Sequence, residues 1–443
     1  MATQGDHVRL FFSILSLFSL LCASVAHANL LNIAPESVEA EAWSIVDAQS
    51  GQIISEHNSH IQRAPASLTK MMVAYITLKE LKAGKLHKTD ILTATPVVNM
   101  VMWDESQMYL KPGEQISIDQ LLAGLIVMSA NDAAVTLAER ISGNVPDFLK
   151  RMNQEAQALG MKDTYFSNPA GVTMPDHYST SHDLALLAQA IVKQTPDYLS
   201  YSKLPSFSYQ QRFHRATNLA LKIDPTADGL KTGYTKAAGY NLALTAKRPT
   251  MNVDIPDRRM IVVVLGTKNA HKRAEVANKL MNLAYAYTRD EEVIKNNQTI
   301  AELPVIKSTL KMFKVETHQP TVVTTSLYNQ PQAIDLNNFD NVTQRLYLPL
   351  GNGQKQLLEP LETTNTRINV ELNEQQLTAP LMKAINLATI QIYQNNQLIH
   401  SVQIADNVHI EEANFFQRFF MWVKGIFSFF GHDQQTAKLY PLH

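Results

Sequence analysis

The sequence predicts a mixed α/β domain with an antiparallel sheet and a helical subdomain, followed by a small all-β domain. Apolar residues recur at helical spacing in three early segments, residues 64–78, 119–128 and 133–141. Alternation typical of strands occurs at residues 42–47, with Gly51 at the following turn, and at residues 240–246. Beyond residue 298, short alternating runs dominate, at 321–325, 344–350, 368–372 and 388–393.

The first 28 residues predict a secretory signal peptide. A short basic start precedes an apolar run over residues 10–21, and Ala26-His27-Ala28 provides small residues before a cleavage site at Asn29. We therefore expect the mature chain to be exported. The single cysteine, Cys22, falls in the removed segment, so no disulfide framework is expected.

The first helical segment carries the string Ser67-Leu68-Thr69-Lys70 directly after Pro65, which is positioned to open a helix. A spacing of i, i+3 puts the two polar side chains side by side, so a neutral Lys70 amine could take the hydroxyl proton as Ser67 attacks a carbonyl carbon. Ser200–Lys203 and Ser308–Lys311 have the same form. The first is followed by Leu-Pro and the second lies in a strand-like stretch, so we interpret both as structural.

Ser129-Ala130-Asn131 lies where the apolar helix over residues 119–128 ends and a new helix begins near Asp132. A hydroxyl at this junction could relay a proton to a leaving amine, and the amide could hold the lysine and the substrate. Ser142-Gly143-Asn144 has the same form, but it follows the helical run over 133–141 with Gly as the stop. We interpret that second copy as a helix C-terminus.

Lys231-Thr232-Gly233 precedes Tyr234, a turn and the strand-like residues 240–246, which places it on the edge strand of a hairpin. A lysine and a threonine there offer charge and a hydroxyl to a substrate carboxylate, and Gly233 allows a ligand backbone to approach closely. Burial beside Lys231 is also expected to lower the pKa of Lys70, by desolvation and by repulsion between like charges.

Residues 298–407 predict the all-β domain. A polar stretch that starts at Asp290 follows the long helix over residues 271–287 and marks the expected boundary, which leaves residues 29–290 for the first domain. The 39 basic and 40 acidic residues nearly cancel, and nothing in the chain indicates nucleic-acid binding.

Residues 411–431 predict an amphipathic helix at a membrane interface. Its polar residues gather on one side, and aromatic residues cover the rest: Phe415, Phe416, Phe419, Phe420, Trp422, Phe427, Phe429 and Phe430. The segment is too short and too interrupted to span a bilayer. The alternative is a helix that packs its aromatic face on the protein.

Together, these motifs resemble the D-alanyl-D-alanine carboxypeptidases, the low-molecular-mass penicillin-binding proteins among the serine peptidases. The resemblance covers roughly residues 31–287 and includes Ser129–Ala134, Lys231–Thr235 and Ala238–Asn241. It implies a β-lactamase/transpeptidase-like catalytic domain at residues 29–290. It also implies a serine DD-carboxypeptidase that removes the terminal D-alanine from peptidoglycan pentapeptides.

By this resemblance, Ser67 is the acylated nucleophile, Lys70 its base and Ser129 a proton relay. Substrate binding would fall to Asn131, Lys231, Thr232, Gly233 and Tyr234. The oxyanion would lie between the backbone N–H groups of Ser67 and Tyr234. The implied partners are peptidoglycan stem peptides and β-lactam antibiotics as covalent inhibitors. The implied location is the periplasm, with the C-terminal helix holding the protein on the outer face of the inner membrane.

Three alternatives remain open. A β-lactamase would share the strings, but class A enzymes add a glutamate in a Glu-x-x-Asn loop for deacylation, and residues 155–171 contain no such element. A DD-endopeptidase would use the same residues on a cross-linked strand. A non-enzymatic cell-wall binding protein would retain the fold and lose the nucleophile or the lysine, both of which are present here.

No cofactor and no metal are expected. His177 and His182 are the candidate ligands, in Asp176-His177-Tyr178 and Ser181-His182-Asp183. Their spacing is not that of a metal site, so we interpret them as ordinary loop histidines.

Overall fold

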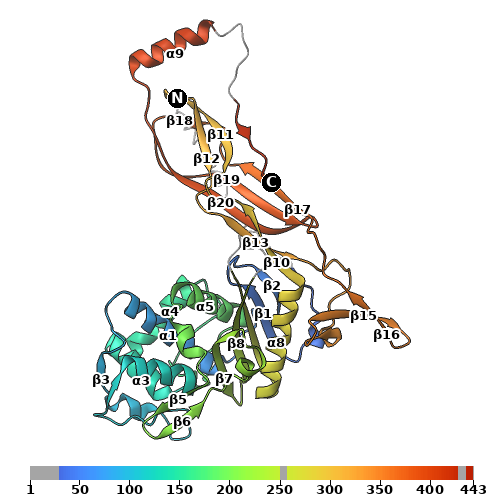
Figure 1. Ribbon diagram of the computed structural model, residues 1–443. Helices are drawn as coiled ribbons and strands as arrows, with labels where there is room; N and C mark the ends of the chain where they lie inside the picture. The colour runs from blue at the N-terminus through green and yellow to red at the C-terminus, as the bar shows by residue number, and fades with distance from the viewer. Residues whose placement is uncertain (1–28, 250–256, 428–435, 443) are drawn as a thin grey trace, which may run out of the picture.

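The computed structural model of the chain describes residues 29–249, 257–427 and 436–442. The signal peptide expected at residues 1–28 lies outside the described residues. The rest forms a rounded α/β body and an elongated β-rich arm that carries a helix at its far end (Figure 1). This arrangement confirms the predicted fold class, a mixed α/β domain with strands in the C-terminal region.

A five-stranded antiparallel sheet forms the centre of the body, in the order β2-β1-β9-β8-β7. The strands are β1 (Ala42–Asp47), β2 (Ile53–His57), β7 (Ala227–Thr235), β8 (Gly239–Arg248) and β9 (Arg258–Thr267). The β1–β2 hairpin has Gly51 at φ +77° in its turn, a conformation that suits glycine. Strand β7 lies at the edge of the sheet, as the sequence predicts.

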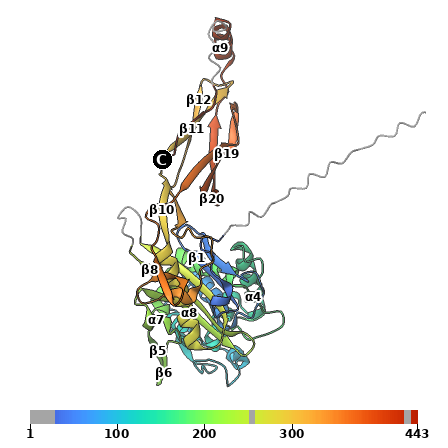
Figure 2. The ribbon, with the colours of Figure 1, turned by 90° about the vertical axis from the view of Figure 1, so that its right-hand side faces the viewer.

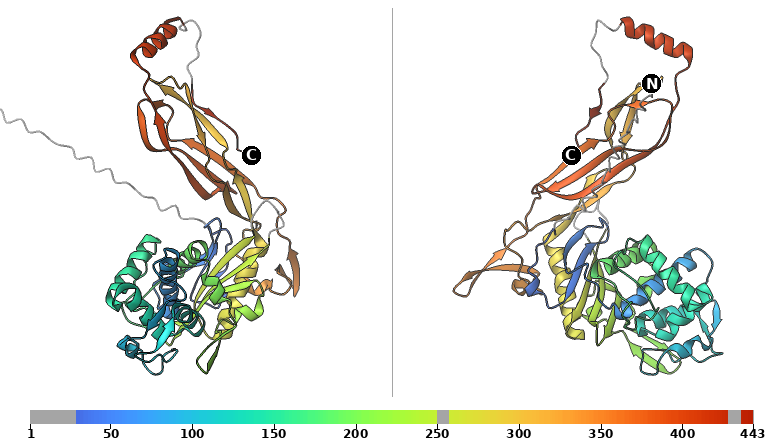
Figure 3. Two further views of the ribbon diagram at one scale, coloured as in Figure 1. Left: turned by 60° about the vertical axis from the view of Figure 1, so that its left-hand side comes forward. Right: turned by 180° about the vertical axis from the view of Figure 1, so that it is seen from behind.

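The sheet lies between two hydrophobic cores. Alternate residues of a strand face opposite sides, so Ile261 and Val263 of β9 pack with the helical subdomain, and Val262 and Val264 pack with the long helix α8 (Ala270–Tyr287). All four are fully buried. Figure 3 shows α8 and the helical subdomain on opposite sides of the sheet. The edge strand β7 is therefore part of a rigid layer.

Short helices and turns make up the helical subdomain. The helices are α1 (Lys70–Lys82), α2 (Ile118–Ala123), α3 (Asn131–Ser142), α4 (Val145–Ala158), α5 (Ser181–Gln194), α6 (Tyr198–Ser202) and, against α8, α7 (Ala220–Ile223). The subdomain also contains the 3₁₀ turns η2 (Ala66–Thr69) and η3 (Pro96–Met100) and the π-turn η4 (Gly124–Met128). The 3₁₀ turn η1 (Pro35–Ser37) lies instead beside the α8 core, where the Ser37 hydroxyl accepts from the backbone N–H of Leu336. Two small antiparallel strand pairs complete the subdomain, β3 (Ile91–Thr93) with β4 (Gln115–Ser117), and β5 (Ser206–Tyr209) with β6 (Arg212–Arg215).

The arm has a hydrophobic core of its own. Its strands are β10 (Thr288–Ile294), β11 (Thr299–Ile306), β12 (Met312–Glu316), β13 (Thr321–Ser326), β17 (Thr366–Leu372), β18 (Leu377–Thr378), β19 (Leu381–Gln394), β20 (Gln397–Ile410) and β21 (Lys438–Leu439). Strand β10 pairs with β13 and starts before the boundary expected near residue 290, and β20 runs past residue 407. The domain limits remain a prediction.

Residues 327–361 leave the arm and return to the body. This excursion holds η5 (Leu336–Asn338), β14 (Phe339–Asp340), β15 (Arg345–Gly351) and β16 (Gln354–Leu358). Leu336, Phe339 and Leu346 are buried in the core around α8, and the Tyr287 hydroxyl of α8 donates to the Leu358 carbonyl at 2.7 Å. The excursion therefore joins the arm to the body by apolar packing.

A buried ion cluster also lies at this junction. The Arg258 guanidinium contacts carboxylate oxygens of Asp47 at 2.8 Å and of Asp290 at 2.9 Å. Burial and the neighbouring Asp47 raise the pKa of Asp290 to about 7, and Arg258 opposes this rise. One arginine between two carboxylates thus links β1, β9 and β10.

Helix α9 (Phe415–Phe427) lies beyond the arm, at the end of the molecule away from the body (Figure 2). Its side chains Phe415, Phe416, Phe419, Phe420 and Trp422 are all at least half exposed. After α9 the chain returns to the arm, where β21 pairs with β11. Among the described helices, none has the length and apolar character that crossing a bilayer requires.

Candidate active site

Ser67 and Lys70 meet at the start of α1. The sequence predicts a helix that starts at Pro65, whereas the structure has the 3₁₀ turn η2 before α1. Ala66, the first residue of η2, adopts a positive φ of +52°, which lies outside the φ range of a right-handed α-helix, so the α-helix starts only after this turn. In a 3₁₀ turn, side chains three residues apart are eclipsed, so the Lys70 Nζ lies 3.0 Å from the Ser67 Oγ.

Lys70 is fully buried. Burial lowers the pKa of its amine to about 7, although the carboxylates of Glu105 and Asp132 raise it. This confirms the expected direction of the shift. The ammonium also donates to the Ala170 carbonyl. At neutral pH a substantial share of Lys70 is therefore the free base, in contact with the Ser67 hydroxyl.

The loop that follows α4 packs against η2. Gly171 has φ +85°, and a Cβ built there would lie 2.0 Å from the Ala66 carbonyl oxygen. Only glycine fits this close approach. The loop therefore fixes both the turn that carries Ser67 and the carbonyl that holds Lys70.

Ser129 and Asn131 lie where the sequence predicts a helix junction. Ser129 caps η4 in the left-handed conformation, at φ +61°. Its buried hydroxyl is among the few side-chain oxygens of the described residues with no hydrogen-bond partner. Such a hydroxyl can accept and pass on a proton once substrate enters. The Asn131 amide donates to Glu105, a carboxylate that the sequence analysis missed.

Lys231, Thr232 and Gly233 lie on the edge strand β7, and all three are buried. The Lys231 Nζ donates to the Thr232 carbonyl at 2.9 Å. Burial, together with the charges of Lys70 and Arg273, lowers the pKa of Lys231 well below its usual value. A bound substrate carboxylate would therefore stabilise the charged form of Lys231.

Gly233 brings β7 against η2. A Cβ at this position would lie 2.9 Å from Leu68 and 3.0 Å from the Ser67 backbone nitrogen. Its neighbour Tyr234 is exposed and lies on the ring of Tyr240, with the ring centroids 4.2 Å apart. Tyr234 borders the cleft, one residue beyond the point where Gly233 brings β7 close to the Ser67 backbone.

Two residues of the site come from segments without a recognisable motif. Thr217 hydrogen-bonds to the Thr232 hydroxyl at 2.5 Å, and Arg273 of α8 donates to the carbonyls of Gly233 (3.2 Å) and Thr217 (3.0 Å). Arg273 thus holds β7 and the preceding loop together. No local pattern marks either residue, because each acts through a contact distant in sequence.

His177 is buried beside η2, which differs from the ordinary loop histidine that the sequence suggests. The backbone N–H of Ser167 donates to its Nδ1 (3.1 Å), so Nε2 carries the proton and donates to the Thr69 hydroxyl (2.8 Å). That hydroxyl in turn donates to the Ala66 carbonyl at 2.8 Å. Burial lowers the pKa of His177 to about 4, so it is a neutral support for η2.

A cleft lies over these groups. It is lined by Ser67, Glu105, Asn131, Thr173, Tyr234 and Lys236, among others. The serines of the other two Ser-x-x-Lys strings, here called the decoy serines, lie elsewhere. Ser200 is in α6, where its hydroxyl donates to the Asp197 carbonyl, and Ser308 follows β11 in the arm. Ser67 of the first string and Asn131 of the second line this cleft, whereas Lys231, Thr232 and Gly233 lie buried next to it, on the strand that approaches Ser67.

The chain is similar to known proteins over most of its length. Residues 29–269 match a family described as D-alanyl-D-alanine carboxypeptidase. The chain is 30% identical to D-alanyl-D-alanine carboxypeptidase DacC of Escherichia coli, over 91% of this chain and 92% of that protein. It is 33% identical to D-alanyl-D-alanine carboxypeptidase DacF of Bacillus subtilis, over 65% of this chain and 72% of that protein. Penicillin binding protein 5 of Haemophilus influenzae has a similar structure, with a TM-score of 0.70, 28% identity and coverage of 86% of this chain and 100% of that one.

Proposed function

The chain belongs to the D-alanyl-D-alanine carboxypeptidase family of serine peptidases, and on this premise we propose that it releases the terminal D-alanine of peptidoglycan pentapeptides through an acyl-enzyme on Ser67. One observation carries the assignment of roles. The amine of Lys70, buried and with a pKa of about 7, lies 3.0 Å from the Ser67 hydroxyl. A nucleophile and its base are therefore already in hydrogen-bond contact.

In the acylation step, Lys70 takes the Ser67 proton while Oγ attacks the carbonyl carbon of the penultimate D-alanine. The oxyanion that forms is held by the backbone N–H groups of Ser67 and Tyr234. The proton then passes through the Ser129 hydroxyl to the amide nitrogen, the C–N bond breaks, and D-alanine leaves. The unpartnered hydroxyl of Ser129 supports this relay.

In the deacylation step, Lys70 takes a proton from water, and the hydroxide equivalent attacks the ester carbon. The Ser67–carbonyl bond breaks, Ser67 regains a proton from Lys70, and the shortened peptide leaves as a carboxylic acid, which gives its remaining proton to the solvent. A β-lactam would enter the same path, because its strained amide presents the same carbonyl to Ser67. Similarity to a penicillin binding protein supports this covalent inhibition.

Recognition of the substrate carboxylate falls to β7. Lys231 supplies a positive charge and Thr232 a hydroxyl, and Thr217 and Arg273 hold that strand in place. Asn131 would orient the scissile amide from the opposite side of the cleft. This division matches a substrate that ends in a free carboxylate one residue beyond the attacked carbonyl.

The exposed aromatic face of α9 supports attachment to a membrane surface. Among the described residues of this helix, five aromatic side chains lie exposed on the same element as Arg418. We propose that α9 lies in the outer face of the inner membrane and holds the catalytic body in the periplasm. The body, whose residues line the cleft, lies at the opposite end of the arm from α9 (Figure 1).

A product assay tests the proposed reaction. The protein is incubated with a pentapeptide muropeptide and, separately, with a cross-linked dimer, and products are identified by mass. We expect release of D-alanine from the pentapeptide, no release by Ser67→Ala, and normal release by the decoy variant Ser200→Ala. Comparable cleavage of the dimer would identify a DD-endopeptidase instead. A β-lactam adduct on Ser200 or Ser308 would refute the assignment of Ser67.

A further inference from the structure

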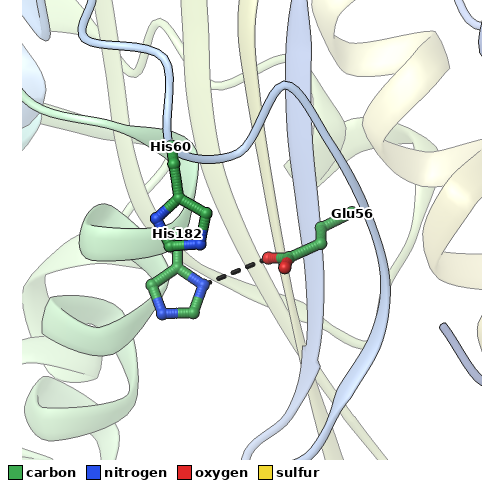
Figure 4. Close-up of side chains that lie close together, drawn as sticks. All are labelled: Glu56, His60 and His182. Atoms are coloured by element: carbon green, nitrogen blue, oxygen red, sulfur yellow. Dashed lines mark hydrogen bonds and ion pairs between the residues drawn. The ribbon is translucent and has the colours of Figure 1, made fainter. Parts of the chain in front are cut away.

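Two histidines and a glutamate converge outside the active-site cleft. Glu56 is the penultimate residue of β2, His60 lies in the loop after this strand, and His182 lies in the first turn of α5. One donor atom from each residue can be chosen so that all three lie within 4.8 Å of one another. Figure 4 shows the two rings one above the other, with the Glu56 carboxylate facing them. The ring centroids are 4.5 Å apart, and the His182 Nδ1 lies 3.1 Å from Glu56.

A fourth residue orients one of the rings. The Nδ1 of His60 lies 3.1 Å from a carboxylate oxygen of Asp163. With the proton on Nδ1, the other nitrogen of His60 presents a lone pair to the cluster. A carboxylate that accepts from the far side of an imidazole is the usual outer partner of a metal-binding histidine. The backbone N–H of Asp163 is in turn fixed by Asp183 at 2.8 Å.

We propose that Glu56, His60 and His182 form a binding site for a divalent transition-metal ion of the zinc class. Two imidazoles and one carboxylate suit zinc, whereas magnesium and calcium prefer oxygen ligands alone. Ligand atoms about 2.1 Å from a tetrahedral ion lie roughly 3.4 Å from one another. The contact of 3.1 Å between His182 and Glu56 is close to that spacing, and a small rotation of the exposed His60 closes the rest.

The position of the cluster suggests what an ion would do. The loop that carries His60 leads directly to η2 and Ser67. This loop is already fixed to α5 by the hydrogen bond from the backbone N–H of His182 to the Ser59 carbonyl (3.1 Å). The backbone N–H of Arg63 also donates to the carbonyl of Ser179, just before α5 (2.8 Å). A metal ion would add a third link between β2, this loop and α5. Its role is therefore structural, a clamp on the segment that precedes the nucleophile.

Cobalt and zinc titration of the whole exported chain tests the site. The protein carries no histidine tag, is stripped with a chelator and is titrated with Co²⁺. We expect one Co²⁺ per chain with the visible absorption of a four-coordinate ion, and loss of that absorption on addition of Zn²⁺ but not of Mg²⁺ or Ca²⁺. The same result is expected in a Ser67→Ala background, which separates the metal site from the proposed hydrolysis.

Variants define the ligands. His60→Ala should abolish the absorption, and because His60 is exposed its loss should leave the circular dichroism spectrum unchanged. Glu56→Gln should also abolish it, and Asp163→Asn should weaken binding about 10- to 100-fold. His87→Ala is the matched control, because His87 pairs with Asp90 at the surface and belongs to no cluster of three potential ligands among the described residues. An unchanged spectrum in His60→Ala, or no ion bound by the wild type, would overturn the proposal and leave an ion pair between His182 and Glu56.

Discussion

The Nζ of the fully buried Lys70 lies 3.0 Å from the Oγ of Ser67, so the proposed nucleophile and its proposed base are in contact in the absence of substrate. This contact depends on the 3₁₀ turn η2, because the turn eclipses side chains three residues apart. The protonation state of Lys70 depends instead on burial, which lowers the pKa of its amine to about 7. The turn therefore sets the geometry of the pair, and burial sets the charge of the amine.

The rate of acylation should follow the titration of Lys70. The free amine is the form that accepts a proton, so labelling by a fluorescent penicillin should rise with pH through about 7 and level off above it. Lys70→Arg keeps a permanent charge and should lose about 10²–10⁴-fold in labelling rate. The control Lys203→Arg changes the exposed lysine of a decoy string and should have no effect. Rapid labelling of the Lys70→Arg variant would rule out Lys70 as the base.

Gly171→Ala should lower the rate of acylation strongly, with only a small effect on the free energy of unfolding. Its Cβ would lie 2.0 Å from the Ala66 carbonyl and would push η2 away from the loop that holds Lys70. A misplacement of reacting groups by about 1 Å can cost about 100-fold in rate, and we expect a loss of that order here. Gly160→Ala is a matched control, because Gly160 has a similar φ of +78° but open space around its Cβ position. Equal rates in the two variants would mean that backbone strain, not contact with Ala66, limits this position.

Lys231 should discriminate a free carboxylate from an amide. Hydrogen bonds to charged groups contribute about 1.5–3 kcal/mol, so amidation of the terminal D-alanine should reduce kcat/KM of the wild type by roughly 10- to 150-fold. Lys231→Ala should lose much less on amidation. Lys236→Ala removes an exposed lysine of the same cleft and should behave as the wild type. Identical losses in wild type and Lys231→Ala would place the carboxylate elsewhere.

His177 should make stability depend on pH. Its pKa is about 4 in the fold and about 6.5 in the unfolded chain, so below pH 6.5 the unfolded state binds a proton that the folded state does not. The contribution of His177 to the free energy of unfolding therefore falls as pH falls, by about 2 kcal/mol between pH 7.5 and 5. Urea unfolding at both pH values should show this loss reduced in His177→Asn and retained in the control His87→Asn. A pH dependence unchanged in His177→Asn would assign it to other groups.

The features of the fold and the site that the sequence predicts are those that depend on residues close together along the chain. The i, i+3 contact of Ser67 with Lys70, the hairpin of β7 with β8 and the helix stop at Gly143 are all set by neighbours along the chain. Thr217 and Glu105 carry no such pattern, because their partners Thr232 and Asn131 are distant in sequence.

Distance along the chain also explains the other surprises. His60 and His182 are separated by more than a hundred residues, and only the packing of the β2 loop on α5 brings them together. The excursion over residues 327–361 alternates like any strand region, so its return to the α8 core has no local signal. Sequence spacing therefore predicts elements and their motifs, whereas contacts between elements need the fold.

The final prediction concerns α9 and the membrane. Truncation after Asp406 would remove the end of β20, where Val408 and Ile410 are buried, so substitutions within α9 are the cleaner test. Phe416→Glu with Phe420→Glu places two charges among exposed aromatic residues. Burying each ring fully contributes on the order of 1.5–3 kcal/mol, less at an interface, so binding to vesicles of anionic phospholipid should fall more than tenfold.

The charge-matched control is Asn414→Asp with Gln417→Glu, which adds two charges beside the start of the helix, where Asn414 already accepts the backbone N–H of Gln417 at 2.9 Å. This control should retain most vesicle binding, since it leaves the aromatic side chains intact. Neither variant should change the rate on a small soluble D-alanyl-D-alanine peptide, because the residues that line the cleft belong to the body, and the arm separates the body from α9 (Figure 1). If the two variants lose vesicle binding equally, charge rather than the aromatic face governs attachment. If neither loses it, α9 is not the membrane-binding element.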